Sequence, residues 1–179
     1  MRMVAGVAAL GLAVLLPVFG SPAADAATVA GPVAAGTAAA NGRALPTTVG
    51  AMRFSWLPAG LGQPSSFDYS YGSVDFSSTV WESETADGWQ VDLHLTVLSG
   101  AALSDGQALY DWFTDYQQRP PEDVDYRPVT VRGQPGWLTG DQLFYLVRPG
   151  LAVSITVDPS RWSTADLWGI ARHGHPARA

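Results

Sequence analysis

The most regular stretch of the chain runs Trp89-Gln90-Val91-Asp92-Leu93-His94-Leu95-Thr96-Val97. Apolar and polar residues alternate along it, which is the pattern of a β-strand with one face on a core. The face expected to be buried carries Trp89, Val91, Leu93, Leu95 and Val97. The opposite face, with Asp92 and His94, is expected to meet solvent. Such one-sided alternation is typical of antiparallel sheets, and the rest of the fold is inferred outward from this strand.

Further strands and two helices are predicted on both sides of it. Segments rich in β-branched and aromatic residues predict strands at 52–57, 67–72, 76–81, 128–132, 136–139, 143–148 and 151–157. A helical period predicts helices over 104–118 and 164–172. Capping boxes are expected at their starts, formed by Ser104 with Gln107 and by Ser163 with Asp166.

The connections between these segments are short, and short turns join antiparallel neighbours. We therefore predict an α+β fold, with an antiparallel sheet of about six to seven strands and both helices packed on one face. The length of 179 residues suits a single domain. All seven Trp lie between Trp56 and Trp168, which places that domain at 51–172.

Composition excludes several classes of function. The chain has ten Arg, no Lys and a net charge of −6, so no basic cluster is present to bind the phosphates of nucleic acids. It has no Cys, which excludes disulfides, Cys-ligated zinc, iron–sulfur clusters and thiol nucleophiles. No cofactor or metal is expected. The domain is expected to be a monomer.

The N-terminus has the layout of a secretory signal. Arg2 precedes an apolar run that Pro17 interrupts, and Ala24-Asp25-Ala26 supplies small residues for cleavage between Ala26 and Ala27. An uncleaved membrane anchor is the alternative, but spanning helices need about 20 apolar residues. Residues 1–26 are expected to be a signal peptide and 27–50 a flexible leader rich in Ala, Gly, Pro and Thr. Residues 173–179 are expected to be a tail. The protein is then secreted or held in the cell envelope, with no membrane span after cleavage.

Candidate chemistry is sparse. No Gly-x-Ser-x-Gly string marks a hydrolase nucleophile. Carboxylates gather at Glu82, Glu84 and Asp87 and again at Glu122, Asp123 and Asp125, but neither group has the spacing of a calcium loop, so solvated turns are the simpler interpretation. His173 and His175 are only two ligands on a Gly/Pro-containing tail, which defines no closed metal site.

An aromatic stripe carries the main binding hypothesis. Phe67, Tyr69 and Tyr71 share one face of a predicted strand and Phe76 follows on the next, and this stripe of four aromatic residues is expected to be either core or an exposed platform. The face opposite the helices is the candidate binding face, formed by Tyr69, Tyr71, Trp81, Asp92 and His94.

The order of motifs adds a resemblance. Phe54-Ser55-Trp56-Leu57-Pro58-Ala59-Gly60-Leu61, then Val129 to Leu138, Leu143-Phe144-Tyr145, Pro149 to Val153 and Ser163 to Leu167 resemble small extracytoplasmic domains of actinobacterial exported and anti-sigma-factor-like proteins. Tyr145 stands where Trp is expected in that group. The resemblance implies a non-enzymatic sensing or binding domain outside the membrane. We therefore expect a secreted or envelope binding module without catalytic activity, whose partner is an envelope or extracellular protein or a glycan. A secreted carboxylate-dependent hydrolase is the alternative.

Overall fold

The computed structural model of the protein describes residues 46–119 and 122–177. The expected signal peptide, its cleavage site at Ala26 and Ala27, and residues 27–45 of the expected leader lie outside the described residues. In the part of the chain that the structure describes, neither helix has the length and apolar character needed to cross a membrane.

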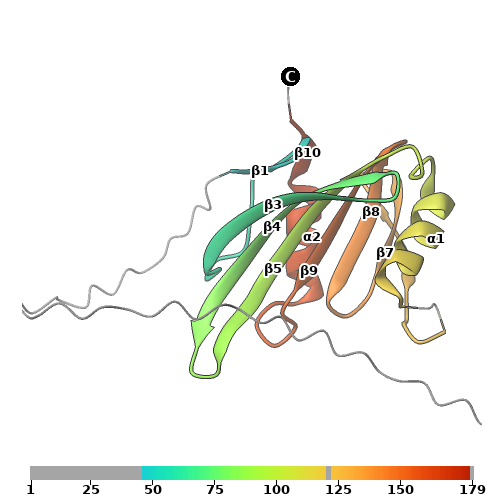
Figure 1. The fold of residues 1–179 in the computed structure, drawn as a ribbon. Coiled ribbons are helices and arrows are strands. Elements are labelled where there is room, and N and C mark those ends of the chain that lie inside the picture. Colours follow the sequence, from blue (N-terminus) through green and yellow to red (C-terminus); the bar gives the residue numbers. More distant parts are fainter. Residues whose placement is uncertain (1–45, 120–121, 178–179) are drawn as a thin grey trace, which may run out of the picture. The chain divides into compact units, whose positions relative to one another are not determined.

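A seven-stranded antiparallel sheet forms the body of the fold (Figure 1), with the strand order β3-β4-β5-β9-β8-β7-β6. Every neighbouring pair runs antiparallel, so the predicted α+β class and antiparallel sheet are confirmed. The strands are β3 (Gln63–Tyr71), β4 (Val74–Thr85), β5 (Gly88–Ser99), β6 (Arg127–Val131), β7 (Gln134–Leu138), β8 (Gln142–Arg148) and β9 (Leu151–Val157).

A second, three-stranded sheet is built from the two ends of the described chain. It has the order β1-β2-β10, from β1 (Thr47–Val49), β2 (Met52–Phe54) and β10 (Gly174–Pro176). The leader expected over 27–50 and the tail expected over 173–179 therefore each contribute a strand, and the boundaries at 51 and 172 were too narrow. Val49 is buried in the same cluster as Phe54, so this sheet shares the main core. Three-residue strands without clear alternation give little signal in a sequence.

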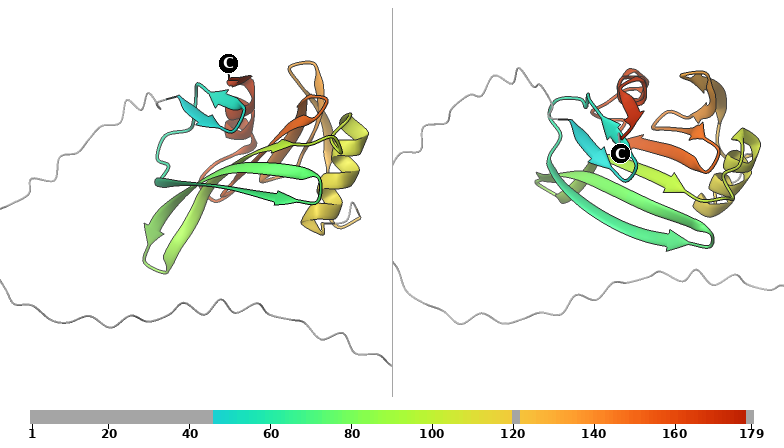
Figure 2. Two further views of the ribbon diagram at one scale, coloured as in Figure 1. Left: turned by 45° about the horizontal axis from the view of Figure 1, so that its top comes forward. Right: turned by 90° about the horizontal axis from the view of Figure 1, so that it is seen from above.

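The two helices, α1 (Gly106–Gln117) and α2 (Thr164–Arg172), pack on opposite faces of the large sheet (Figure 2). Phe144 of β8 packs on Phe113 of α1, with ring centroids 4.7 Å apart. Its neighbour Tyr145 lies in the cluster that contains Leu167 of α2. Successive strand residues point to opposite faces, so we name these the α1 face and the α2 face.

The prediction that both helices share one face is therefore wrong. Strand β8 is buried at five successive positions, Gln142 to Leu146, which indicates a strand covered on both sides. The α2 face is covered by α2 and the small sheet, because both contribute to its buried cluster. The α1 face is covered by α1 at the end that carries Phe76, Leu98 and Leu146.

The predicted N-terminal cap is present in α2 but not in α1. Ser163 caps α2, and its capping box with Asp166 is present as predicted. In α1 the cap is Asp105 and not Ser104, because the Asp105 side chain accepts a hydrogen bond from the Ala108 amide at 2.9 Å. Ser and Asp are both favourable N-cap residues, and in α1 the residue after Ser104 takes this position.

Strand β5 extends beyond the sheet at its start. Strand β9 pairs with β5 only from Leu93 to Ser99, so residues before Leu93 pair with β4 alone, in a hairpin that projects past the sheet (Figure 1). Trp89 is consequently 66% exposed and Val91 47% exposed, although the alternation predicted both as core. Leu93, Leu95 and Val97 are buried as predicted.

Candidate functional site

The five residues of the predicted binding face do not lie together. Tyr69, Tyr71 and His94 lie on the α1 face, as their pairing with β4 and β5 shows. Trp81 points to the other face and is buried in the α2-face cluster. Asp92 is fully buried. The structure therefore brings Tyr69, Tyr71 and His94 to one face, and it buries Trp81 and Asp92 away from that face.

A β-bulge explains the position of Asp92. The register between β4 and β5 shifts between Trp81 and Glu82, so that Trp81 pairs with Leu93 and Glu82 with Val91. Asp92 is the extra residue, and a bulge re-aims the side chain of the strand that carries it. Asp92 and His94 therefore lack the common face that strict alternation predicted.

Asp92 joins three segments of the chain. Its carboxylate forms an ion pair with Arg161 and accepts hydrogen bonds from the Gly62 amide at 2.7 Å and from the Ser83 hydroxyl at 2.5 Å. A Cβ on Gly62 would lie 1.9 Å from the carbonyl oxygen of Glu82, so only glycine can bring that amide so close to β4. All of these contacts hold the loops before β3 and after β9 against the hairpin, which indicates a structural role for Asp92.

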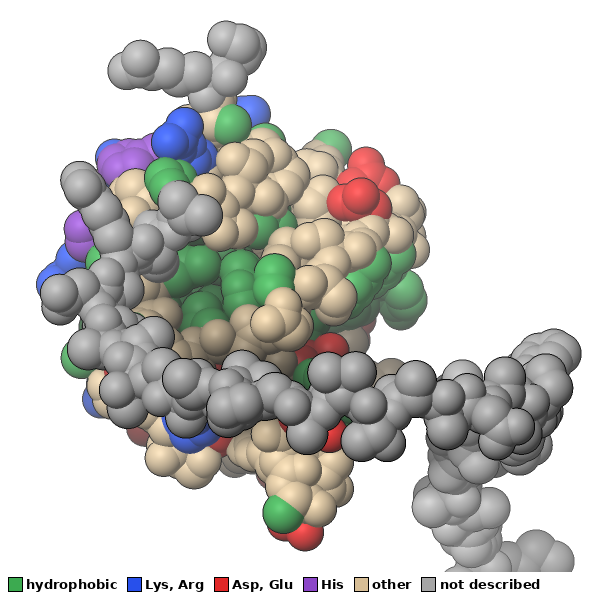
Figure 3. Space-filling model, turned by 90° about the vertical axis from the view of Figure 1, so that its left-hand side faces the viewer, with side chains coloured by type: hydrophobic (Ala, Val, Ile, Leu, Met, Phe, Trp, Pro, Cys, Tyr) green, Lys and Arg blue, Asp and Glu red, His purple; other side chains and the backbone are tan. Residues whose placement is uncertain are grey.

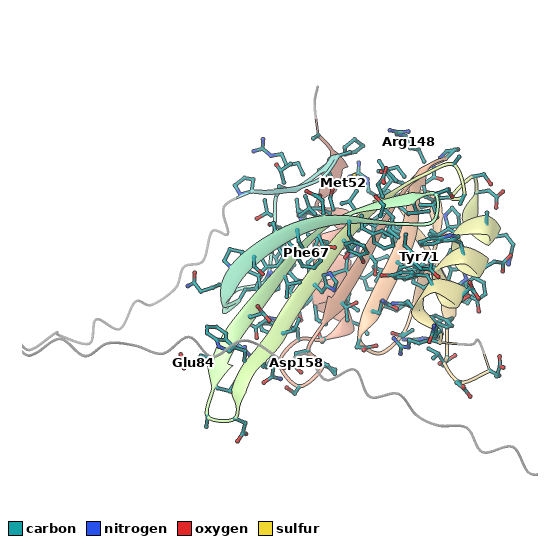
Figure 4. All side chains as sticks on the ribbon, in the orientation of Figure 1. Met52, Phe67, Tyr71, Glu84, Arg148 and Asp158 are labelled. Carbon is teal, nitrogen blue, oxygen red and sulfur yellow. The ribbon has the colours of Figure 1, made fainter. Side chains whose placement is uncertain are left out.

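The exposed large apolar side chains of residues 46–119 and 122–177 all lie on the α1 face. Phe67, Tyr69 and Tyr71 of β3 lie on the same face as buried Phe76, as the pairing of β3 with β4 shows. Val91 and Trp89 of β5 pair with Glu82 and Glu84 of β4, which lie on that face as well. The five are Phe67, Tyr69, Tyr71, Trp89 and Val91, which are 36–66% exposed. Figure 4 labels Phe67 and Tyr71 along β3, with Tyr71 at the end nearer α1. Phe67, Tyr69 and Tyr71 of the aromatic stripe therefore form an exposed platform, whereas Phe76 belongs to the core.

Two rings of this platform, Tyr69 and Tyr71, contact α1. Tyr69 stacks on Phe76, with centroids 4.4 Å apart, and its hydroxyl lies 2.8 Å from that of Tyr116. Burial and this hydrogen bond raise the pKa of Tyr69, so the phenol stays neutral. Tyr71 makes an edge contact with Tyr116 at 5.2 Å. Rings held in this way lose little conformational entropy when a ligand stacks on them.

Beside the platform lies a block of uncharged polar side chains, which we call the polar patch. It crosses four neighbouring strands of the α1 face in two rows. In the first row Ser78 of β4, Thr96 of β5 and Ser154 of β9 lie side by side. In the second row His94 of β5, Thr156 of β9 and Gln142 of β8 lie side by side. The polar patch consists of Ser78, His94, Thr96, Gln142, Ser154 and Thr156. Sequence reasoning singled out only His94, because the others become neighbours only through the strand order.

Gln142 leaves one hydrogen-bonding atom of the polar patch open. Its amide nitrogen donates to the Thr156 hydroxyl at 3.2 Å and to the Ser154 hydroxyl at 3.4 Å. Its Oε1 atom is buried and has no partner within the described residues. Such an acceptor costs free energy unless water or a ligand donates to it.

His94 links the polar patch to the platform. Its Nε2 lies 3.0 Å from the Thr96 hydroxyl, and its ring centroid lies 6.2 Å from that of Phe67. Burial lowers the pKa of His94 below its ordinary value of 6.5. The imidazole is therefore neutral at pH 7, with one nitrogen that donates and one that accepts.

This pKa predicts how His94 affects stability. The unfolded chain takes up a proton on His94 near pH 6.5 and the folded chain only at lower pH, so its stabilising contribution is present above pH 6.5 and is lost as the pH falls below it. His94→Gln keeps an amide near Thr96 but does not titrate. We expect the wild type to lose more stability than His94→Gln between pH 7.5 and pH 5.5 in urea unfolding. The pKa of His175 is also lowered, but that residue is common to both proteins and cancels. Parallel losses in the two proteins would contradict the burial of His94.

The remaining candidates do not form a shared centre. Within residues 46–119 and 122–177, no three His, Asp or Glu side chains gather as a metal site. The first acidic group lies along the projecting hairpin, and the second, Glu122 to Asp125, lines a shallow surface pocket with Tyr110 and Tyr126. His175 contacts Arg132, so it belongs to a cationic region and is no tail residue.

No protein-family model, curated protein or solved structure matches the chain. The resemblance to small extracytoplasmic domains of actinobacterial proteins therefore stays a prediction. Platform and polar patch are the two features on which a function can be based.

Proposed function

We propose that the protein is a non-catalytic binding module whose exposed part of the α1 face binds an uncharged glycan. One observation carries the proposal: within the described part of the chain, all five exposed large apolar side chains lie on the one face that also bears the polar patch. Scattered exposed apolar residues need no explanation, but a collection on one face is typical of a binding surface. The expected signal peptide supports a site of action outside the membrane.

The chemistry of this face favours an uncharged ligand that carries many hydroxyl or amide groups. The polar patch carries hydroxyls, one amide and a neutral imidazole and contains no charged side chain. His94 and Thr156 are its partly exposed members, and the other four side chains are buried beside them. The open acceptor at Gln142 calls for a donor on the ligand. A sugar ring presents an apolar face that can stack on an aromatic ring and hydroxyls that can hydrogen-bond beside it. Glu82 and Glu84 on the same face, and the net charge of −6, disfavour anionic ligands.

Calorimetric titration with a β-1,4-linked hexamer of N-acetylglucosamine tests the proposal, because this probe is neutral and carries amide donors. We expect saturable binding, and we expect Phe67→Ala and Trp89→Ala each to weaken it about tenfold, or about 1.4 kcal/mol. Both side chains are exposed, so each variant should unfold within about 1 kcal/mol of the wild type.

Trp168→Ala is the control, because Trp168 packs on the α2-face cluster. Its affinity for the hexamer should match that of the wild type. Absence of binding by the wild type, or equal binding by all four proteins, would contradict the proposal. Release of shorter oligosaccharides during the titration would instead indicate the carboxylate-dependent hydrolase.

A further inference from the structure

A small pocket lies between the small sheet and one end of the large sheet, away from the platform. Its volume is about 170 Å³. Its wall is partly apolar, with Met52 of β2, Val131 of β6 and Pro176 of β10. Arg132, Gln134 and Tyr145 also line it and supply its polar side chains. None of these residues belongs to the glycan site proposed above.

The hydroxyl of Tyr145 is an unused hydrogen-bond donor in this pocket. Tyr145 is 2% exposed, and its hydroxyl has no partner within the described residues. The hydroxyl lies beside Gly174, another lining residue, since a Cβ on Gly174 would lie 3.2 Å from it. Burial raises the pKa of Tyr145, so the group stays a protonated donor at neutral pH. A buried hydroxyl without a partner costs free energy that a ligand in the pocket would recover.

Arg132 supplies charge and further donors next to this hydroxyl. Its Nη1 donates to the Gly174 carbonyl at 2.7 Å and contacts the His175 ring. Its Nε and Nη2 groups have no hydrogen-bond partner in the described part of the chain. A guanidinium donates through a planar fork that matches the two oxygens of a carboxylate.

The surroundings of the pocket carry positive charge in an otherwise acidic protein. An adjoining pocket of about 720 Å³ is lined by Arg53, His175 and Pro176, and among the described residues no Asp or Glu lines either pocket. Figure 3 shows Arg and His side chains gathered along the upper left edge of the molecule. Anions are therefore drawn to this corner.

We propose that this pocket binds the carboxylate of a small organic acid. One carboxylate oxygen accepts a hydrogen bond from the Tyr145 hydroxyl and the other accepts from the free donors of Arg132. A short apolar tail contacts Met52, Val131 and Pro176. The apolar wall and the small volume favour such an acid over phosphate, which needs polar contacts on every side.

Titration of the full chain with sodium butyrate, followed by protein NMR, tests this site. We expect saturable shifts at residues that line the pocket, and we expect Tyr145→Phe to weaken butyrate binding about tenfold. Tyr145→Phe removes only an unpartnered hydroxyl, so it should fold at least as stably as the wild type without butyrate. Arg132→Gln should weaken binding as well, because it removes the charge.

Tyr126→Phe is the matched control, because Tyr126 packs against the cluster under α1. It should bind butyrate as the wild type does. Equal binding by Tyr145→Phe and the wild type would overturn the site, as would the absence of saturable shifts. Tighter binding of phosphate than of butyrate in a parallel titration would overturn the carboxylate assignment. Loss of the glycan site would leave these results unchanged, because the two sites share no residue.

Discussion

Asp92→Ala is expected to lower the free energy of unfolding by about 3–5 kcal/mol. The Asp92 side chain is fully buried, and its removal leaves Arg161, the Gly62 amide and the Ser83 hydroxyl without their acceptor. Loss of the shared acceptor costs more than the ion pair itself contributes, because the Gly62 amide and the Ser83 hydroxyl stay desolvated, whereas the Arg161 side chain is 38% exposed and can be hydrated. Chemical unfolding in urea measures the effect.

Asp68→Ala is the matched control for this experiment, because Asp68 lies on the exposed strand β3. It should change stability by less than about 0.5 kcal/mol. Asp92→Asn should fall between the two, since its amide oxygen can still accept a hydrogen bond but forms no ion pair. A loss below about 1 kcal/mol for Asp92→Ala would show that Asp92 is the solvated strand residue that simple alternation predicts.

The second large effect is expected for Leu95→Ala, which should cost about 2–5 kcal/mol. Leu95 is fully buried in the α2-face cluster, and truncation leaves a cavity beside Ile155 and Thr79, the residues that it pairs with. Tyr71→Ala should cost about 1 kcal/mol or less, because Tyr71 is 56% exposed. Urea unfolding of both variants in parallel checks the comparison. Equal losses would mean that the aromatic platform is part of the core.

The fold could be predicted from the sequence wherever a local pattern was long or chemically distinctive. The centre of β5, from Leu93 to Val97, and the capping box of Ser163 with Asp166 are both local signals, and the structure has both. Alternation assigns the side chains of a strand to two faces, but it does not say which helix covers which face. The faces on which α1 and α2 pack could therefore not be predicted from local patterns. They become visible only in the assembled sheet, where one side of β8 contacts the cluster of α1 and the other side contacts the cluster of α2.

The candidate site was harder to predict because pairing between distant segments creates it. The bulge at Asp92 becomes visible only in the register of β4 against β5. Ser154 and Thr156 of β9 alternate with apolar residues in the sequence, which gives a weak signal of a polar face. Their contact with Gln142 and His94 follows from the order β5-β9-β8, and no local pattern contains that order.

The most direct test of the central claim is a map of backbone amide shifts on titration with the hexamer of N-acetylglucosamine. If the exposed α1 face is the binding surface, the shifts will concentrate in β3 from Phe67 to Tyr71 and in β5 from Trp89 to Thr96, with the Gln142 side-chain amide among the affected signals. Shifts confined to α2 or the small sheet, or no saturable shift at all, would contradict the account.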